Sequence, residues 1–307
     1  TVTGPLTTLV RKRPKDEYLP GVFTYTDSDG GQVELDLEIR ARGHFRHQNC
    51  DYPPVLLNLK RKQTVGTLFE HQNKLKLVIQ CDRSDSYEQA VLREYLAYRI
   101  LNKLTDKSFR VRLLSVTYVN TEKERDNDPR YAFLIEHKNR LAERFDLKDL
   151  EIEKTFVGAL DGAQLNLTSI FELLIGNTDF SPIAGAPGDE CCHNYVLFGE
   201  GDIPQWAVPY DFDQSGFVDA PYAGPGPNLR IRDVKQRLYR GRCLNNEHVE
   251  SSLQAFREAE SVIYGLVEEQ PGLRPYVRKE LARYIEDFYE LINDPKDVQR
   301  DIIDECI

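Results

Sequence analysis

The sequence predicts an α+β protein with two lobes, a β-rich N-terminal lobe over residues 1–138 and a helical C-terminal lobe over residues 139–307. Two observations predict this division. Apolar and β-branched runs of strand length dominate the first part of the chain, whereas the chain from Glu247 onward has apolar residues at helical spacing. The hydrophobic fraction of 40% is large enough to bury a sizeable core.

The N-terminal lobe is predicted to consist of several strands and one helix. Residues 32–39 (QVELDLEI) alternate apolar and polar side chains, as a half-buried strand does. Residues 87–104 carry apolar side chains at helical spacing without glycine or proline, which predicts one amphipathic helix. The charged residues 120–130 predict a solvated loop between strands. Further strands are predicted at residues 55–59, 75–79, 111–119 and 131–135.

The C-terminal lobe is predicted to begin with a helix at residues 165–175, followed by a glycine- and proline-containing loop at residues 179–190. Two short strands are expected at residues 194–198 and 205–209. From Glu247 to residue 307 one helix is expected to follow another, punctuated by the prolines at positions 271, 275 and 295.

Composition and charge exclude some classes of function. A formal charge of −10 gives no general attraction for nucleic-acid phosphates, so a bulk nucleic-acid binder is disfavoured. No apolar run approaches the roughly 18 residues of a membrane helix, so no membrane span is expected. The first residue is Thr1, as in a mature protein after removal of a signal peptide or in a trimmed chain. We therefore expect a secreted, periplasmic or cell-surface protein.

An even number of cysteines agrees with an oxidising compartment. Cys50 precedes a predicted strand and Cys81 ends another, so a bridge between them would tie the N-terminal sheet together. Cys191, Cys192 and His193 could instead join Cys243 at a zinc ion, although adjacent cysteines lack the usual ligand spacing. Asn166 begins an Asn-Leu-Thr glycosylation sequon. The six cysteines are Cys50, Cys81, Cys191, Cys192, Cys243 and Cys306.

The segment 208–216 (VPYDFDQSG) places Asp211 and Asp213 two residues apart directly after an apolar strand. Two carboxylates at a strand end can direct their oxygens at one hard cation such as Mg²⁺, which completes its shell with phosphates and water. A polar turn that only ends the strand is the alternative.

Upstream, residues 173–180 (LLIGNTDF) end an apolar helix in a loop that presents Asp179, and Asn194 then opens the next strand. Protein kinases place a catalytic-loop Asp, a metal-binding Asn and a metal-binding Asp in this order along the chain. The interval between Asp179 and Asn194 is longer than in the kinase motif, so this interpretation requires an insertion.

A kinase also needs a strand lysine that reaches the nucleotide phosphates and pairs with a glutamate on the following helix. Lys76 lies on the predicted strand KLKLVI, and Glu94 lies on the predicted helix that follows. Lys74 shares the strand face of Lys76 because strand side chains alternate, so either lysine could serve. A solvated lysine edge and a helix-surface glutamate form the alternative.

These motifs together resemble the CotH family of spore-coat-protein kinases, over about residues 33–220. The resemblance implies a two-lobed protein-kinase-like fold that uses ATP with Mg²⁺ or Mn²⁺. It also implies transfer of the γ-phosphate to a hydroxyl of a protein, peptide or glycan acceptor. Like that family, the chain lacks an HRD tripeptide and a strict glycine-rich loop. The motifs are RARG at residues 40–43, KLKLVIQCDRSDSY, LREYLAYRI, YAFLIEH, IGNTDF, HN and VPYDFDQSG.

The resemblance assigns roles to individual residues. Lys76 would contact the phosphates and Glu94 would orient it, while Asp179 would lie in the catalytic loop and Asp211 would bind the metal. Arg42 and Gly43 fall where the family has an arginine-glycine turn near the nucleotide.

Two other classes of function remain open at this stage. One is a pseudokinase, in which the same fold serves as a binding or scaffolding module. The other is a metal-dependent hydrolase that uses Asp211 and Asp213 without nucleotide. Lys76 and Glu94 favour the kinase over the hydrolase, and Asp179 together with Asp211 favours it over the pseudokinase.

Overall fold

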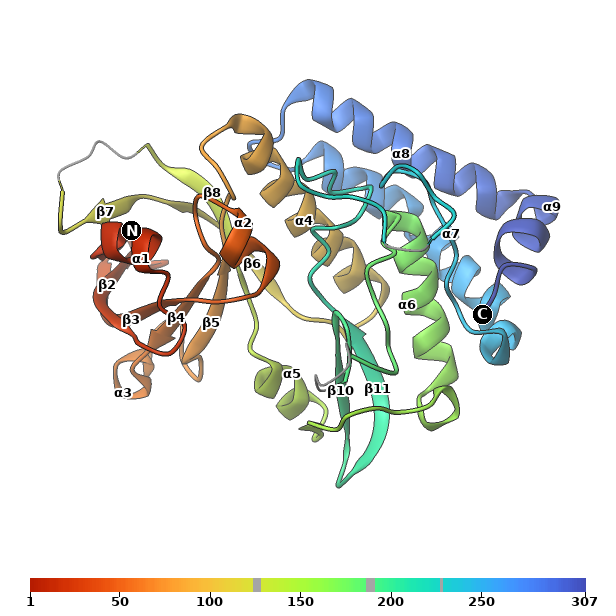
Figure 1. Cartoon of the computed structure of the whole chain (residues 1–307), viewed down its shortest axis with the longest axis horizontal. Helices are drawn as coiled ribbons and strands as arrows, with labels where there is room; N and C mark the ends of the chain where they lie inside the picture. Colours follow the sequence, from red (N-terminus) through yellow and green to blue (C-terminus); the bar gives the residue numbers. More distant parts are fainter. Residues whose placement is uncertain (124–127, 186–190, 227–228) are drawn as a thin grey trace. The chain divides into compact units, whose positions relative to one another are not determined.

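The computed structural model describes residues 1–123, 128–185, 191–226 and 229–307 (Figure 1). It confirms the predicted α+β class. Contacts within the chain divide it into two compact units. Unit 1 comprises Thr1–Val91 and Val111–Arg140, and unit 2 comprises Leu92–Arg110 and Leu141–Ile307. The predicted loops at residues 120–130 and 179–190 lie partly outside the described residues.

Unit 1 is built on one eight-stranded sheet in the order β6-β8-β5-β4-β3-β2-β1-β7. Neighbouring strands are antiparallel except for the parallel pair β1 and β7. Alternate side chains point inward and form a buried core. The strands are β1 Val2–Gly4, β2 Leu19–Thr26, β3 Gln32–Ala41, β4 Val55–Leu59, β5 Lys74–Val78, β6 Val111–Val116, β7 Tyr118–Asn120 and β8 Arg130–Ile135.

The sheet of unit 1 closes on itself. Its two edge strands, β6 and β7, are separated in sequence by Thr117 alone. Because one residue spans at most about 3.6 Å, the two edges must come together, and the sheet curls like a barrel. The predicted strand over residues 111–119 is confirmed except at Thr117, where it is interrupted, and its two parts supply both edges of the sheet.

Three described helices lie wholly in unit 1, and a fourth, α4, begins there. The long helix α4 starts in unit 1 and continues into unit 2, and its start agrees with the predicted helix to within two residues. In unit 1, Glu88 of α4 accepts hydrogen bonds from the backbone of Tyr131 (2.7 Å) and from Arg130 (2.9 Å), which fixes the helix start to β8. The helices are α1 Leu6–Lys12, α2 Phe45–Asn49, α3 Arg61–Thr64 and α4 Asp85–Leu104.

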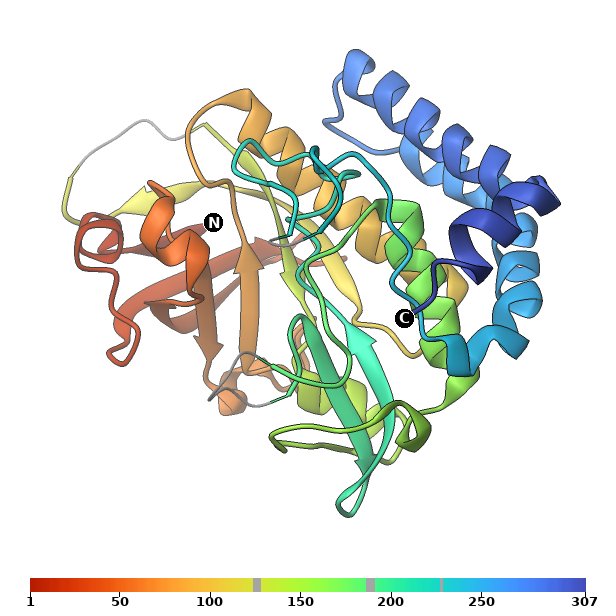
Figure 2. The same cartoon turned by 45° about the vertical axis from the view of Figure 1, so that its right-hand side comes forward.

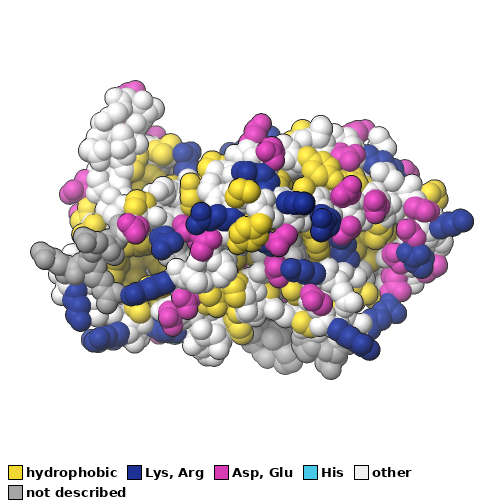
Figure 3. Space-filling view, turned by 90° about the horizontal axis from the view of Figure 1, so that it is seen from above, with side chains coloured by type: hydrophobic (Ala, Val, Ile, Leu, Met, Phe, Trp, Pro, Cys, Tyr) yellow, Lys and Arg dark blue, Asp and Glu magenta, His cyan; other side chains and the backbone are white. Residues whose placement is uncertain are grey.

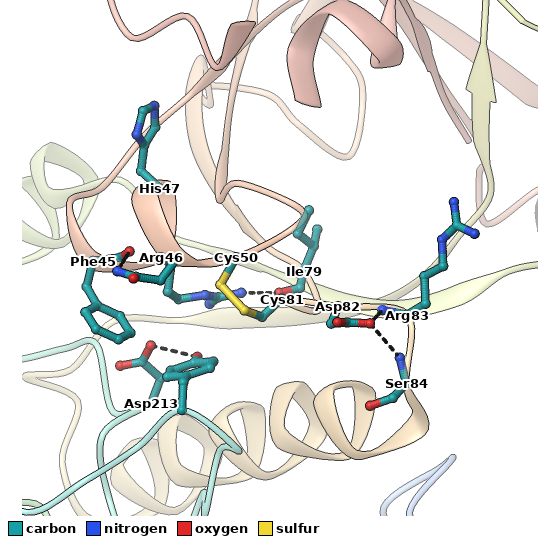
Figure 4. Close-up of a disulfide and its surroundings, with 12 residues drawn as sticks. Phe45, Arg46, His47, Cys50, Ile79, Cys81, Asp82, Arg83, Ser84 and Asp213 are labelled. Carbon is teal, nitrogen blue, oxygen red and sulfur yellow. Dashed lines mark hydrogen bonds between the residues drawn. A yellow bond between two sulfur atoms is a disulfide. The ribbon is translucent and has the colours of Figure 1, made fainter. Parts of the chain in front are cut away.

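A disulfide between Cys50 and Cys81 joins the end of α2 to the segment after β5, as predicted. Figure 4 shows the guanidinium of Arg46 lying beside this bridge, where it donates a hydrogen bond to the carbonyl of Ile79. Arg46 is 8% exposed, so this contact satisfies part of a buried charge. The bridge and Arg46 together fix the loop that follows the lysine-bearing strand.

Unit 2 contains a buried central helix and a C-terminal pair of long helices. Helix α6 begins at an Asp161 cap, whose side chain accepts from the backbone of Gln164, and nearly all of its residues are buried. Helices α7 and α8 lie side by side in Figures 1 and 2, with Phe256 packed on Phe288. The helical segments are α5 Lys138–Arg144, η1 Val157–Ala159, α6 Gly162–Ile175, η2 Cys243–His248, α7 Val249–Glu268, α8 Pro275–Asn293, α9 Pro295–Val298 and η3 Gln299–Ile303.

The small sheet of unit 2 has the order β11-β10-β9, with β9 Lys148–Asp149, β10 Tyr195–Glu200 and β11 Ile203–Pro209. Strands β10 and β11 form an antiparallel hairpin that pairs Tyr195 with Pro209. The residues before β10 and after β11 therefore meet at the same end of the hairpin.

Two expectations are corrected in unit 2. Cys191 is bonded to Cys192, and Cys243 is bonded to Cys306, so the alternative zinc site is wrong. Asn166 is only 1% exposed and donates to the carbonyl of Asn245, so its sequon is not accessible to a glycan. The sequence pattern could not reveal this because burial depends on how α6 packs.

The surface carries both signs of charge. Lys and Arg side chains are interspersed with Asp and Glu on the face shown in Figure 3. Within the described ranges, no helix is both long enough and apolar enough to cross a membrane.

Candidate functional site

The candidate site begins at the end of α6, where the chain turns sharply at Gly176. This glycine has φ 62° and ends the helix in the left-handed conformation. A Cβ at this position would lie 2.1 Å from the hydroxyl oxygen of Tyr284. The carbonyl of Gly176 accepts from the backbone of Gly216 (3.2 Å), which holds the segments after α6 and after β11 together.

The loop that follows Gly176 presents Asp179. Both carboxylate oxygens of Asp179 are in contact with residues that precede β10. His193 Nε2 lies 2.7 Å from Oδ1, and Asn194 Nδ2 donates to Oδ2 (3.1 Å) and to the Asp179 carbonyl (2.6 Å). The structure therefore brings Asp179 and Asn194 into direct contact, despite the long interval between them.

Asp211 lies at the same end of the hairpin as Asn194. The backbone of Tyr210 donates to the Asn194 carbonyl (3.0 Å), and Asp211 follows with φ 64°. The Asp211 backbone N–H donates to the hydroxyl of Tyr98 (2.9 Å), and the next residue, Phe212, is fully buried. These contacts fix the backbone of Asp211 and leave its side chain partly exposed.

Asp213 has a different environment from Asp211. It is 6% exposed, and its Oδ2 accepts a hydrogen bond from the hydroxyl of Tyr222 (2.9 Å). The two expected metal ligands thus differ in accessibility, because Asp211 with its positive φ interrupts the extended backbone and the two-residue period of a strand does not continue to Asp213.

Buried Glu172 is linked to the Asp179 loop through the side chain of Asn177. Asn177 donates from Nδ2 to Glu172 Oε2 (2.9 Å), and its Oδ1 accepts from the backbone of Asp179 (3.0 Å). Burial raises the pKa of the Glu172 carboxyl to about 8, so this group is largely protonated at neutral pH. The hydrogen bond with Asp179 raises the pKa of His193.

Arg240 holds the same loop through hydrogen bonds to its backbone carbonyls. Its Nη1 donates to the carbonyls of Thr178 and Phe180 (3.0 Å to Phe180), the two residues that flank Asp179. Its guanidinium also lies over the ring of Phe180. Sequence reasoning missed Arg240 because it is far from Asp179 along the chain, and it missed Glu172 because a helical glutamate carries no local signal. His193 was assigned only to the alternative zinc site.

The remaining predicted residues lie on unit 1 and α4. Arg42 donates from Nε to the carbonyl of Val55 (3.3 Å), and Gly43 has φ 81°. Lys74 is exposed and Lys76 is half-buried, both on β5. Glu94 lies on α4 with 2% exposure.

The oxygen donors of the site suit a hard cation. Among the residues that the structure describes, no three His, Cys, Asp or Glu side chains gather as a metal site. Mg²⁺ commonly takes only one or two carboxylates and obtains its other oxygens from phosphate and water, so this finding leaves room for such an ion at Asp211.

No protein-family model matches the chain, and no curated protein matches it either.

Proposed function

We propose that this chain is a secreted, two-lobed, protein-kinase-like phosphotransferase that moves the γ-phosphate of ATP to a hydroxyl of an extracellular acceptor. The acceptor would be a protein, a peptide or a glycan. The lobe of residues 1–138 would contact the nucleotide phosphates, and the lobe of residues 139–307 would hold the metal and the acceptor. Three disulfides agree with an extracellular protein.

One observation carries the proposal. Asp179 follows a buried helix, contacts Asn194 at the start of a β-hairpin, and the hairpin returns to Asp211 at the same end. Protein kinases use this combination, in which one carboxylate meets the acceptor hydroxyl while an amide and a second carboxylate hold the metal.

The metal would be Mg²⁺ or Mn²⁺, held by Asp211, by the amide oxygen of Asn194 and by Asp213. The fit rests on the donor set: Asp211 is partly exposed on a fixed backbone, and the Asn194 nitrogen is already bonded to Asp179, which leaves its oxygen for a cation. When bound, the metal would neutralise charge on the phosphates.

Asp179 would orient the acceptor hydroxyl and receive its proton. The donors His193 and Asn194 hold its carboxylate in one orientation, which such a role requires. Lys76, with Lys74 as the alternative, would contact the phosphates, and Glu94 would orient the lysine. Arg42 and Gly43 would lie near the nucleotide.

Nucleotide binding can be tested by thermal melting. ATP with Mg²⁺ or Mn²⁺ is expected to raise the melting temperature, because a ligand that binds only the folded state adds about 2.7 kcal/mol at a hundredfold excess over Kd. Asp211→Ala should abolish this shift. Asp202→Ala is the matched control, because Asp202 is exposed at the opposite end of the same hairpin.

No shift of the wild type at millimolar nucleotide with either metal would reject the proposal. An equal shift in Asp211→Ala would remove Asp211 from the metal site. If nucleotide raises the melting temperature but no phosphate is transferred to any acceptor, the pseudokinase, a binding or scaffolding module, would be favoured.

A further inference from the structure

The β4–β5 loop, residues 60–73 of unit 1, exposes two large apolar side chains. Val65 is 69% exposed and Leu68 is 53% exposed. Gly66 lies between them with φ 70°, and a Cβ at this position would meet no atom within 4 Å, so the chain turns in open space. Figure 1 shows α3, the first part of the loop, at the end of β4 and β5 opposite α2.

Contacts with strand β2 hold the β4–β5 loop in place. Phe69 is buried, and its ring centroid lies 5.2 Å from that of Phe23 and 5.2 Å from that of Tyr25. The backbone N–H of Leu68 donates to the hydroxyl of Tyr25 (3.2 Å). Val65 and Leu68 are therefore exposed beside an anchored residue, and a partner would find them already presented.

The same loop is basic, in a protein with a formal charge of −10. It begins with Lys60, Arg61 and Lys62, all exposed, and its one acidic residue is Glu70. Lys60 Nζ lies 3.1 Å from Oδ2 of Asp36, so part of this charge is neutralised within the protein. Salt screens exposed charges beyond about 8 Å at physiological ionic strength, so the loop attracts anions despite the negative charge of the whole chain.

Exposed apolar side chains next to lysine and arginine suit a membrane surface. The apolar groups can enter the interfacial region of the bilayer, while the cations contact anionic headgroups. A protein partner is disfavoured, because two apolar side chains are too few for the core of a stable interface and lysine is depleted in such interfaces. Single-stranded nucleic acid is disfavoured because Phe69, the only Phe, Tyr or Trp of the loop, is buried and cannot stack on a base.

We propose that the β4–β5 loop docks on an anionic lipid bilayer, with Val65 and Leu68 in the interfacial region and with Arg61 and Lys62 on the headgroups. This inference does not rest on phosphoryl transfer, because lipid binding can be measured without nucleotide or divalent metal.

Cosedimentation with lipid vesicles is the test. The wild type should bind vesicles of phosphatidylglycerol and phosphatidylcholine but not vesicles of phosphatidylcholine alone, and added salt should weaken the binding. The double variant Arg61→Gln, Lys62→Gln should bind about thirtyfold more weakly, since each cation near an anionic surface contributes about fivefold. The matched control is Arg11→Gln with Lys12→Gln, two adjacent exposed cations of α1 in the same unit.

A second double variant tests the apolar contacts apart from the charge. Val65→Ser with Leu68→Ser should weaken vesicle binding at least about tenfold, because two apolar side chains lose their burial in the interface. Ile203→Ser is the matched control, since Ile203 is an exposed apolar residue of unit 2. All these variants should keep the wild-type melting temperature, because the substituted side chains are exposed.

The lipid assignment would be overturned if the wild type bound neither kind of vesicle, or if either variant of the loop bound as tightly as the wild type. Light scattering tests the main competing occupant. A mass that rises with protein concentration, and that Val65→Ser with Leu68→Ser returns to that of a single chain, would assign the loop to a second copy of the protein instead.

Discussion

At the scale of single residues, the proposed phosphoryl transfer depends on how Asp179 is held. Asn177 binds its backbone N–H, Arg240 binds the flanking carbonyls, and His193 and Asn194 bind its carboxylate. Most of these partners come from distant parts of the chain, so their contacts could not be predicted from local sequence. The order of Asp179, Asn194 and Asp211 could be predicted because kinase motifs follow the chain.

Glu172 should make stability depend on pH. Its pKa is raised to about 8 in the folded protein. Between the ordinary pKa of a glutamate and about pH 8, the folded state therefore holds a proton that the unfolded state has released. Stability should therefore fall by about 1.4 kcal/mol per pH unit in this window as pH rises. Glu172→Gln should remove this decrease. The stability of this variant should therefore rise relative to that of the wild type as the pH increases.

Denaturant unfolding between pH 5 and about pH 9 would measure this difference. Glu153→Gln is a suitable control, because Glu153 is an exposed glutamate of unit 2. Parallel stability curves for wild type and Glu172→Gln would show that Glu172 ionises normally in the fold.

At the scale of elements, hydrophobic patterning predicted most strands and helices. Strand β4 lies where predicted, and α4 begins two residues early, because periodicity reports which face is buried. Strand β2 was not predicted since its sequence, LPGVFTYT, contains proline and glycine, which argue against a strand. The break between β6 and β7 follows from closure of the sheet, which no local pattern encodes.

The turn after α6 allows a test at this scale. Gly176→Ala should destabilise the protein by about 2 kcal/mol or more, because alanine is strained at positive φ and its Cβ would meet Tyr284. Gly201→Ala is the matched control, with φ 60° and open space around it, and should cost about 1 kcal/mol.

Melting temperatures of the two variants would separate backbone strain from the steric conflict. Tyr284→Phe in the Gly176→Ala background removes the hydroxyl and should restore part of the loss. An equal effect of the two glycine substitutions would contradict the tight packing described here.

At the scale of the whole molecule, the even number of cysteines indicated that disulfides form. It did not determine which cysteines are paired. The Cys50–Cys81 bridge was predicted because both cysteines were expected at strand ends, although Cys50 in fact ends the helix α2. The other two bridges were not, since six cysteines allow 15 pairings. The class of fold followed from the contrast between a strand-rich first part and a helical end. The roles proposed for Lys76 and Glu94 stay predictions that require a chemical test.

Transfer of labelled phosphate from ATP is the measurement that tests the central claim most directly. The wild type should label itself or an acidic acceptor, and Asp179→Asn should lower the rate on the order of 10²-fold or more, because the substitution removes a positioned general base. The variant should still show the melting shift with ATP and metal, since Asp211 and Asn194 remain. Equal rates for wild type and Asp179→Asn would contradict the account.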